Sequence, residues 1–384
     1  ARPTENLLTL YSPQMQAFTR AGTSRLAGRI NPQLVSRSLT AAPLRVTSLL
    51  EACPEHSSSY GTTIRPRKFH SSSHVSVAAA VTDTTSSAPV TISGLLDEHA
   101  VKHEFRDASR FSEFSMKWNF AELKKHSDAV ACGLIEKRVQ PGDRVLTLLK
   151  NNAESFATLV GAAKVGAELI VPTSAENLGE LISAVKPKVI ITDKEYYGTN
   201  VLDTLNTLIE DLDQYSIVPL ATLKYPFLRL ILQTGFDRIP GTERFRHFLQ
   251  YGLTPNPLPA RRALLKASQP VLVTVDKDGK NPIVFSQETL LSAAESLIKS
   301  ANIRLEDRVY IQSPKYPFAS LALGAALSAA KGCGVIIPHD LSAPAADVGG
   351  SKYSATVFLG DAQSLANGPK DVRTFDITAI LGKK

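Results

Sequence analysis

The segment Thr274–Pro282 stands between two short apolar runs, where a nucleotide-binding loop could hold phosphate. Such a loop is a Ser/Thr/Gly run followed by Lys, because glycine lets backbone N–H groups close around phosphate oxygens and the lysine adds charge. Only Thr274 and Gly279 fit that pattern. The carboxylates of Asp276 and Asp278 would repel phosphate, and Pro282 occupies the lysine position. The segment therefore indicates a phosphate loop that has lost its chemistry.

A second interpretation of this segment needs no ligand. Asp278 and Gly279 form a dipeptide typical of tight turns, and the flanking runs 270–275 and 282–286 read as two short strands. These features also predict a plain β-hairpin.

Two histidines have the spacing of a metal-binding helix face. His99 and His103 are four residues apart, but Ala100 stands where a zinc protease carries its catalytic Glu. Zinc needs three or four ligands, and the sequence offers no third. We expect a solvated helix face and no metal.

The three cysteines are too few and too far apart for a disulfide framework or a zinc site. The expectation is reduced, buried thiols at Cys53, Cys132 and Cys333.

Charge is distributed unevenly along the 384 residues, whose formal net charge is +7. Residues 1–75 hold nine Arg or Lys against three Glu, so the remaining residues carry a net charge of only +1. A broad phosphate-binding face would need clustered basic residues on the fold itself, so we expect no nucleic-acid partner.

No apolar run approaches the roughly 18 to 20 residues that span a bilayer. The best candidate, 321–330, stops at Lys331. Any membrane contact is therefore expected to be peripheral.

Helix and strand patterns alternate from residue 92 onward. Strands that alternate with helices of this length pair in parallel, so the predicted fold class is α/β, with mostly parallel sheets flanked by helices. The helices are expected at 92–105, 120–136, 152–164, 178–185, 200–212, 287–301 and 318–330, and the strands at 144–149, 168–171, 188–192, 270–275, 282–286, 308–312, 334–337 and 356–359. Ser286 is the expected cap of the helix that follows it.

Several short motifs together resemble the amino-terminal domain of the adenylate-forming superfamily, the acyl-CoA synthetases and their AMP-binding relatives. The resemblance covers residues 92–384 and implies two α/β halves, about 92–265 and 266–384. It is carried by KWNFAEL at 117–123, QPGDRV at 140–145, NNAE at 151–154, KVGA at 164–167, KPKVI at 186–190, DRVYIQSP at 307–314 and KGCGV at 331–335.

The chain departs from the family where the family does chemistry. Pro317 stands where members carry a His in the acyl and adenylate pocket, next to Tyr316 and Phe318. The adenine motif and the small carboxy-terminal domain with its catalytic Lys are not found before Lys384. The resemblance therefore implies a pseudoenzyme, with no catalytic, cofactor-binding or metal-binding residues and no cofactor.

Residues 1–75 form a basic arm rich in Arg, Ser and Ala, typical of a mitochondrial address, and residues 76–91 read as a linker. Because the chain opens on Ala1, we expect that a shorter leader has been removed and that the arm is ordered against a partner. The alternative is an uncleaved leader without a role.

The leading hypothesis is a structural subunit on the matrix side of the mitochondrial inner membrane, bound to other protein subunits. For the assembly, the specific candidate is the chlorophycean algal mitochondrial ATP synthase. There the chain resembles the accessory ASA subunits, which build the peripheral stalk and the dimer contacts. One alternative is a sensor that binds acyl, CoA or nucleotide ligands without reaction, in an apolar slot lined by Tyr316, Phe318, Gly324 and Ala325. Another is a split ligase whose second domain lies on another polypeptide.

Overall fold

The computed structural model describes residues 90–112, 116–214, 220–341, 354–366, 368–369 and 371–381. The predicted basic arm, nearly all of the linker, Cys53 and Lys384 lie outside the described residues.

Seven strands form the larger sheet, in the order β11-β10-β4-β3-β5-β8-β9. Every neighbouring pair is parallel except β10 and β11, which run antiparallel. The inner strands β3, β4 and β5 are almost wholly apolar and buried, as expected for parallel strands covered on both faces. Their bounds are β3 Arg144–Leu148, β4 Glu168–Pro172, β5 Val189–Thr192, β8 Leu230–Gln233, β9 Glu243–Arg244, β10 Pro270–Val275 and β11 Ile283–Ser286.

Six strands form the second sheet, in the order β15-β14-β12-β13-β1-β2. Only β1 and β2 are antiparallel in it. The strands are β1 Asp107–Phe111, β2 Met116–Asn119, β12 Arg308–Gln312, β13 Gly334–Ile337, β14 Val357–Gly360 and β15 Arg373–Asp376, and a separate hairpin joins β6 Glu195–Tyr196 to β7 Thr199–Asn200.

The two sheets do not follow the expected division near residue 265. β1 and β2 come from the first predicted half but pair with strands of the second, while β10 and β11 come from the second half but complete the larger sheet. The predicted mixed α/β class with mostly parallel sheets is confirmed.

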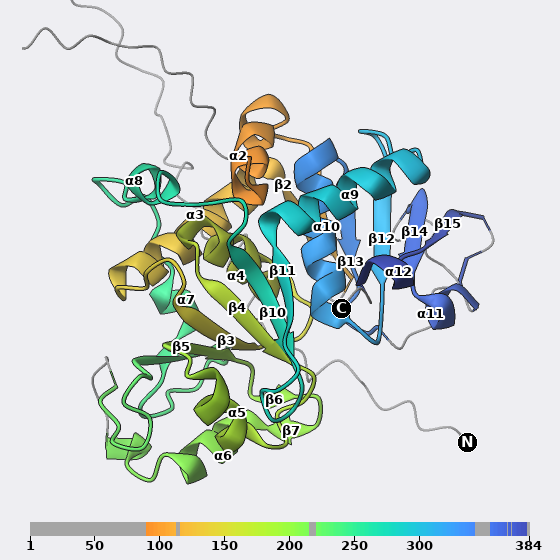
Figure 1. Ribbon diagram of the computed structural model, residues 1–384. Coiled ribbons are helices and arrows are strands. Elements are labelled where there is room, and N and C mark those ends of the chain that lie inside the picture. The colour runs from red at the N-terminus through yellow and green to blue at the C-terminus, as the bar shows by residue number, and fades with distance from the viewer. Residues whose placement is uncertain are drawn as a thin grey trace, which may run out of the picture. The chain divides into compact units, whose positions relative to one another are not determined.

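Helices cover these sheets, and α10 contacts strands of both (Figure 1). Asn119 and Asn152 close capping boxes on α3 and α4, and Ser286 caps α9 as predicted. The helices are α2 Ile92–Lys102, α3 Phe120–Glu136, α4 Ala153–Val165, α5 Leu178–Val185, α6 Val201–Leu208, α7 Phe245–Phe248, α8 Leu258–Arg262, α9 Gln287–Ser300, α10 Pro317–Lys331, α11 Ala362–Ala366 and α12 Thr378–Leu381, with a 3₁₀ turn η1 Leu212–Gln214.

Two predicted helices extend too far. The helix expected over 200–212 ends at Leu208, because the backbone of Ile209 leaves the helical region and turns Ile209 and Leu212 into the core beneath α5 and α6. The expected helix over 92–105 likewise ends at Lys102.

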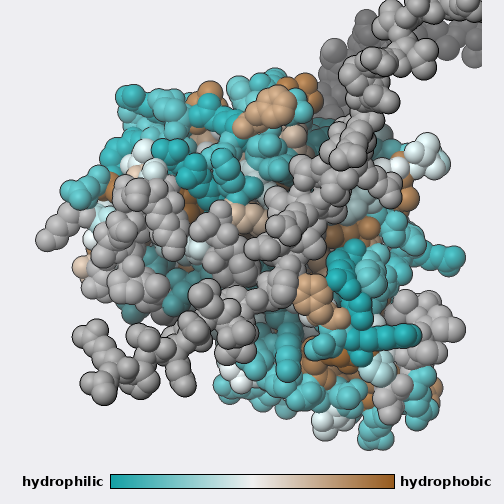
Figure 2. Space-filling view, turned by 180° about the vertical axis from the view of Figure 1, so that it is seen from behind, coloured by the Kyte–Doolittle hydropathy of each residue, from teal (hydrophilic) through white to brown (hydrophobic). Residues whose placement is uncertain are grey.

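The described surface is mainly hydrophilic on the face that Figure 2 shows, with apolar residues in small separate groups. Among the described residues, no helix combines the length and apolar character that a membrane crossing requires.

Candidate functional site

The segment predicted as a failed phosphate loop forms the turn between β10 and β11, at the carboxyl end of β10. The Gly279 N–H donates to the Asp276 carbonyl at 3.0 Å, and the Asp276 N–H donates to the Lys280 carbonyl at 3.1 Å. Gly279 has φ +77°, which only glycine adopts without strain. Thr274 lies in the β10 ladder opposite Ile283. The second sequence interpretation, a β-hairpin, is the one the structure supports.

The carboxylate of Asp276 takes up the donors of this turn. It accepts hydrogen bonds from the N–H groups of Asp278 at 3.2 Å and Lys280 at 2.6 Å, and from the Asn281 carboxamide at 2.9 Å. Desolvation works against the charged form, but these hydrogen bonds outweigh it and hold the pKa of Asp276 below its ordinary value. The turn therefore already contains an anion, and that anion belongs to the chain.

The turn is also fixed to α5. Asp278 accepts a hydrogen bond from the Asn177 carboxamide at 2.5 Å, just before that helix begins. A β-carbon at Gly279 would lie 3.0 Å from the β-carbon of Ala184, so the turn backbone lies directly on the helix. Pro282 is exposed and precedes β11.

The second predicted segment, 314–318, leads into α10. Pro317 is the first residue of that helix, a position where proline costs no hydrogen bond. Phe318 and Ala325 are buried, and a β-carbon at Gly324 would lie 2.9 Å from Val335. Phe318, Gly324 and Ala325 therefore do not line the apolar slot of the sensor alternative, because they pack α10 on the strands beneath it.

The two histidines do not form a solvated face, so that prediction is wrong. His99 is half-buried because α2 packs on α10, and its Nε2 lies 3.0 Å from the Ala329 carbonyl oxygen. Its ring stacks on His103 and also contacts Phe120, and burial lowers the pKa of His99. Within the described ranges, no three His, Cys, Asp or Glu side chains lie close enough to hold a metal ion.

The predicted thiols are confirmed where the structure describes them. Cys132 and Cys333 are buried and unpaired. Burial raises the pKa of Cys333 to about 12, so its thiol stays protonated.

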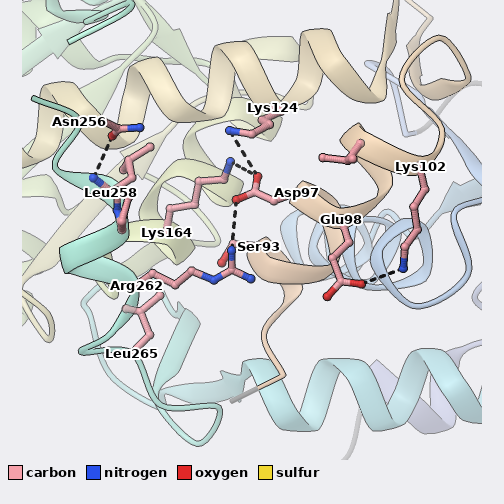
Figure 3. A pocket seen from close by; sticks show the side chains of 12 residues that line it. Ser93, Asp97, Glu98, Lys102, Lys124, Lys164, Asn256, Leu258, Arg262 and Leu265 are labelled. Atoms are coloured by element: carbon pink, nitrogen blue, oxygen red, sulfur yellow. Dashed lines mark hydrogen bonds and ion pairs between the residues drawn. The ribbon is translucent and has the colours of Figure 1, made fainter. Parts of the chain in front are cut away.

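A charged cavity of about 510 Å³ lies between α2, α3, α4 and α8, and no sequence motif pointed to it (Figure 3). At its base, the ammonium of Lys164 lies 2.7 Å from Asp97 Oδ1 and 2.5 Å from Asp128 Oδ1. The Lys164 side chain is only 6% exposed. Lys124 also bonds to Asp128, and Asp97 lies 4.0 Å from Lys124. One feature could have predicted the cluster: Lys164 is a lone basic residue near the end of an otherwise mainly apolar helix.

The cavity and the hairpin turn lie toward opposite ends of the seven-stranded sheet. Lys164 is near the carboxyl end of α4, just before β4 begins, so it lies toward the amino ends of the strands. The turn follows the carboxyl end of β10, which is paired in parallel with β4. In Figure 1, α2 and α8 lie at the top of the sheet and the turn lies below, near β6 and β7.

Comparison with known proteins gives one family match. The model of the AMP-binding enzyme family matches residues 96–229, a range that holds the motifs at 117–123, 140–145 and 164–167 but ends before the hairpin.

Two curated proteins and one solved structure illustrate the similarity. The protein named Putative acyl-CoA synthetase YngI, from Bacillus subtilis, is 28% identical over 154 residues, which are 39% of this chain and 28% of that protein. Enterobactin synthase component E from Escherichia coli is 24% identical over 128 residues, 33% of this chain and 24% of its own length. The structure of the Mycobacterium tuberculosis fatty acyl CoA synthetase aligns with a TM-score of 0.55 and 17% identity, over 72% of this chain and 50% of the other. Thus the matches span about a quarter of the two curated relatives and half of the solved one.

Proposed function

We propose that this chain, whose matches support membership in the AMP-binding superfamily, uses an acyl-CoA synthetase-like fold as a non-catalytic structural module. One observation carries the proposal: the carboxylate of Asp276 accepts the hydrogen bonds that the turn would otherwise offer to phosphate.

The physical argument concerns competition for the same donors. A nucleotide phosphate entering this turn would have to displace Asp276 from two backbone N–H groups and remain close to the carboxylate of Asp278. Adenylation stabilises the charge that develops on the α-phosphate, and each hydrogen-bond donor aimed at such a charge contributes about 3 kcal/mol. A turn whose donors face an internal anion contributes none of this stabilisation.

A retained ligase activity is the rival function, and the names of the matched relatives favour it. YngI is named an acyl-CoA synthetase, and three further relatives carry ligase or synthetase names. Adenylation would release pyrophosphate from ATP in the presence of the right acid, whereas a structural module would not.

The test combines pyrophosphate release with thermal unfolding in the presence of MgATP, AMP, CoA and a panel of short and long fatty acids. We expect no release and no shift in melting temperature with the wild-type chain. The double variant D276G/P282K removes the competing anion and adds the lysine, so it should gain measurable ATP binding. Pro282→Lys alone is the matched control: it adds the same charge, keeps Asp276, and should gain nothing. Pyrophosphate release by the wild type that depends on an added fatty acid would overturn the proposal.

The setting that we propose is a large protein complex on the matrix side of the mitochondrial inner membrane, with the ATP synthase peripheral stalk as the specific candidate. The basic, acid-poor composition of residues 1–75 supports a mitochondrial address and would favour anionic surfaces. Native gels of mitochondria, probed for this chain, test the setting. Migration in a megadalton complex with ATP synthase subunits is the expected result, and a small free species would contradict it.

A further inference from the structure

Cations outnumber carboxylates around the cavity between α2, α3, α4 and α8. Lys102 and Glu98 form a closed pair at 3.1 Å on its rim. The remaining charges are three cations and two carboxylates, an excess of one positive charge: Lys124, Lys164 and Arg262 against Asp97 and Asp128. A surplus cation beside a buried lysine is stabilised by an additional anion.

The two carboxylates leave hydrogen-bonding capacity on the buried lysine. An ammonium group has three N–H donors, and Lys164 directs two of them at Asp97 and Asp128. Desolvation lowers the pKa of Lys124, but its hydrogen bond to Asp128 and its proximity to Asp97 raise the pKa above its ordinary value overall, so this second ammonium stays charged.

Arg262 closes the other side of the cavity. Its guanidinium lies 4.0 Å from Asp97 Oδ2, which is an ion pair but too long for a hydrogen bond. About half of its side chain is exposed. A guanidinium in this state offers the planar fork that binds a carboxylate or phosphate group through two parallel hydrogen bonds.

Apolar side chains line the rest of the cavity. Leu265 is buried, Leu258 is half-buried, and Val101 and Pro259 lie at the edge. Figure 3 shows Leu258 and Leu265 on the side of Arg262. A cavity of about 510 Å³ with convergent cations and an apolar wall has the size and lining of a small-molecule site.

We propose that this cavity binds a small organic anion, with its carboxylate or phosphate group held by Arg262, Lys124 and Lys164 and its apolar part against Leu258 and Leu265. The site lies toward the amino ends of the strands, away from the β10–β11 turn. It is therefore independent of whether the turn binds nucleotide.

Isothermal titration calorimetry on the full chain tests the proposal with butyl phosphate, butyrate, inorganic phosphate, butanol and butylammonium. Butyl phosphate or butyrate should bind, the affinity should fall as salt is raised, and butanol and butylammonium should not bind. Tighter binding of butyl phosphate than of inorganic phosphate would show that the apolar wall contributes to binding. Equal binding of the two would overturn that part of the site.

Arg262→Gln is the decisive variant, because an exposed side chain can be changed without loss of the fold. It should weaken binding by about tenfold, and Arg262→Lys should restore part of the loss. Arg261→Gln is the matched control, because Arg261 is the neighbouring residue of α8 and does not line the cavity. Its guanidinium donates a hydrogen bond to Gln140 Oε1 at 3.0 Å. No binding of any anion by the wild type, or equal binding by Arg262→Gln, would overturn the proposal.

Discussion

The β10–β11 turn and the cavity beside α4 both gather charged groups, toward opposite ends of one sheet. The charges of the turn are satisfied within it, whereas those of the cavity are not balanced. In the turn, the carboxylate of Asp276 accepts hydrogen bonds from its neighbours' N–H groups within six residues of chain. In the cavity, cations from three helices meet two carboxylates and retain an excess positive charge. A local motif can thus neutralise its own charges, whereas the charges of a cluster assembled from distant segments need not balance. Four predictions test this contrast.

The largest effect is expected from the buried lysine. Lys164→Met leaves Asp97 and Asp128 without their shared buried partner, and should lower the free energy of unfolding by about 3 kcal/mol, the lower end for breaking a buried ion pair. Urea unfolding measures it. Lys102→Met is the control: the Lys102 side chain is 64% exposed, so its ion pair with Glu98 should contribute less than about 1 kcal/mol. Equal losses of unfolding free energy in the two variants would show that the buried cluster stabilises the fold no more than an exposed ion pair does.

The second prediction concerns pH. As the pH is lowered, the protonation of His126 on α3 should reduce the free energy of unfolding at a higher pH than the protonation of Asp276 in the turn. Burial, with a smaller contribution from Lys125, lowers the pKa of His126 on α3 to about 4. The unfolded imidazole takes up a proton near pH 6.5 while the folded one resists until about pH 4, so the unfolded state binds more protons in that window. Stability should therefore fall by about 2 kcal/mol as the pH is lowered from 6.5 to 4.5.

His126→Gln should flatten this pH dependence, as followed by urea unfolding at several pH values. His247→Gln, at an exposed position of α7, serves as the control and should leave the slope unchanged. A wild-type slope that persists in His126→Gln would assign the acid sensitivity to another group.

An effect of similar size is expected from the turn glycine. Gly279→Ala places a β-carbon at φ +77° and 3.0 Å from Ala184, so it should cost about 2 kcal/mol. Gly142→Ala has a similar φ of +84° but no atom within 4 Å, so it should cost only the backbone strain, about 1 kcal/mol. Thermal unfolding of both variants separates packing from strain, and equal costs would mean that α5 does not hold the turn.

The smallest effect is expected from the turn carboxylate itself. The pKa of Asp276 is depressed in the folded state, so its contribution to stability is present above the unfolded value of 3.8 and is lost as the pH falls through the folded pKa. Asp276→Asn should be slightly less stable than the wild type at pH 7 and equally stable at strongly acidic pH. A difference that persists in strong acid would contradict this assignment.

Several helices and strands, in both sheets, could be predicted from local pattern. The helix over 120–136 and the strands over 270–275 and 308–312 have the predicted bounds, because apolar periodicity and capping residues act within one turn or strand. β1 could not be predicted, since three of its five residues are polar and the strand pairs with β13, more than 200 residues away. β15 is mostly exposed and pairs only with β14 among the described strands, so it gave no local signal either.

The candidate sites divide in the same way. The residue types alone show that Thr274–Pro282 is a poor phosphate loop, because only Thr274 and Gly279 fit the pattern and Pro282 occupies the lysine position. The packing of distant segments was needed to show that Phe318 and Ala325 are core and that Lys164 meets Asp97 and Asp128. Hydrogen bonds within a turn depend on neighbouring residues, whereas the charge balance of a cavity depends on which distant helices pack together.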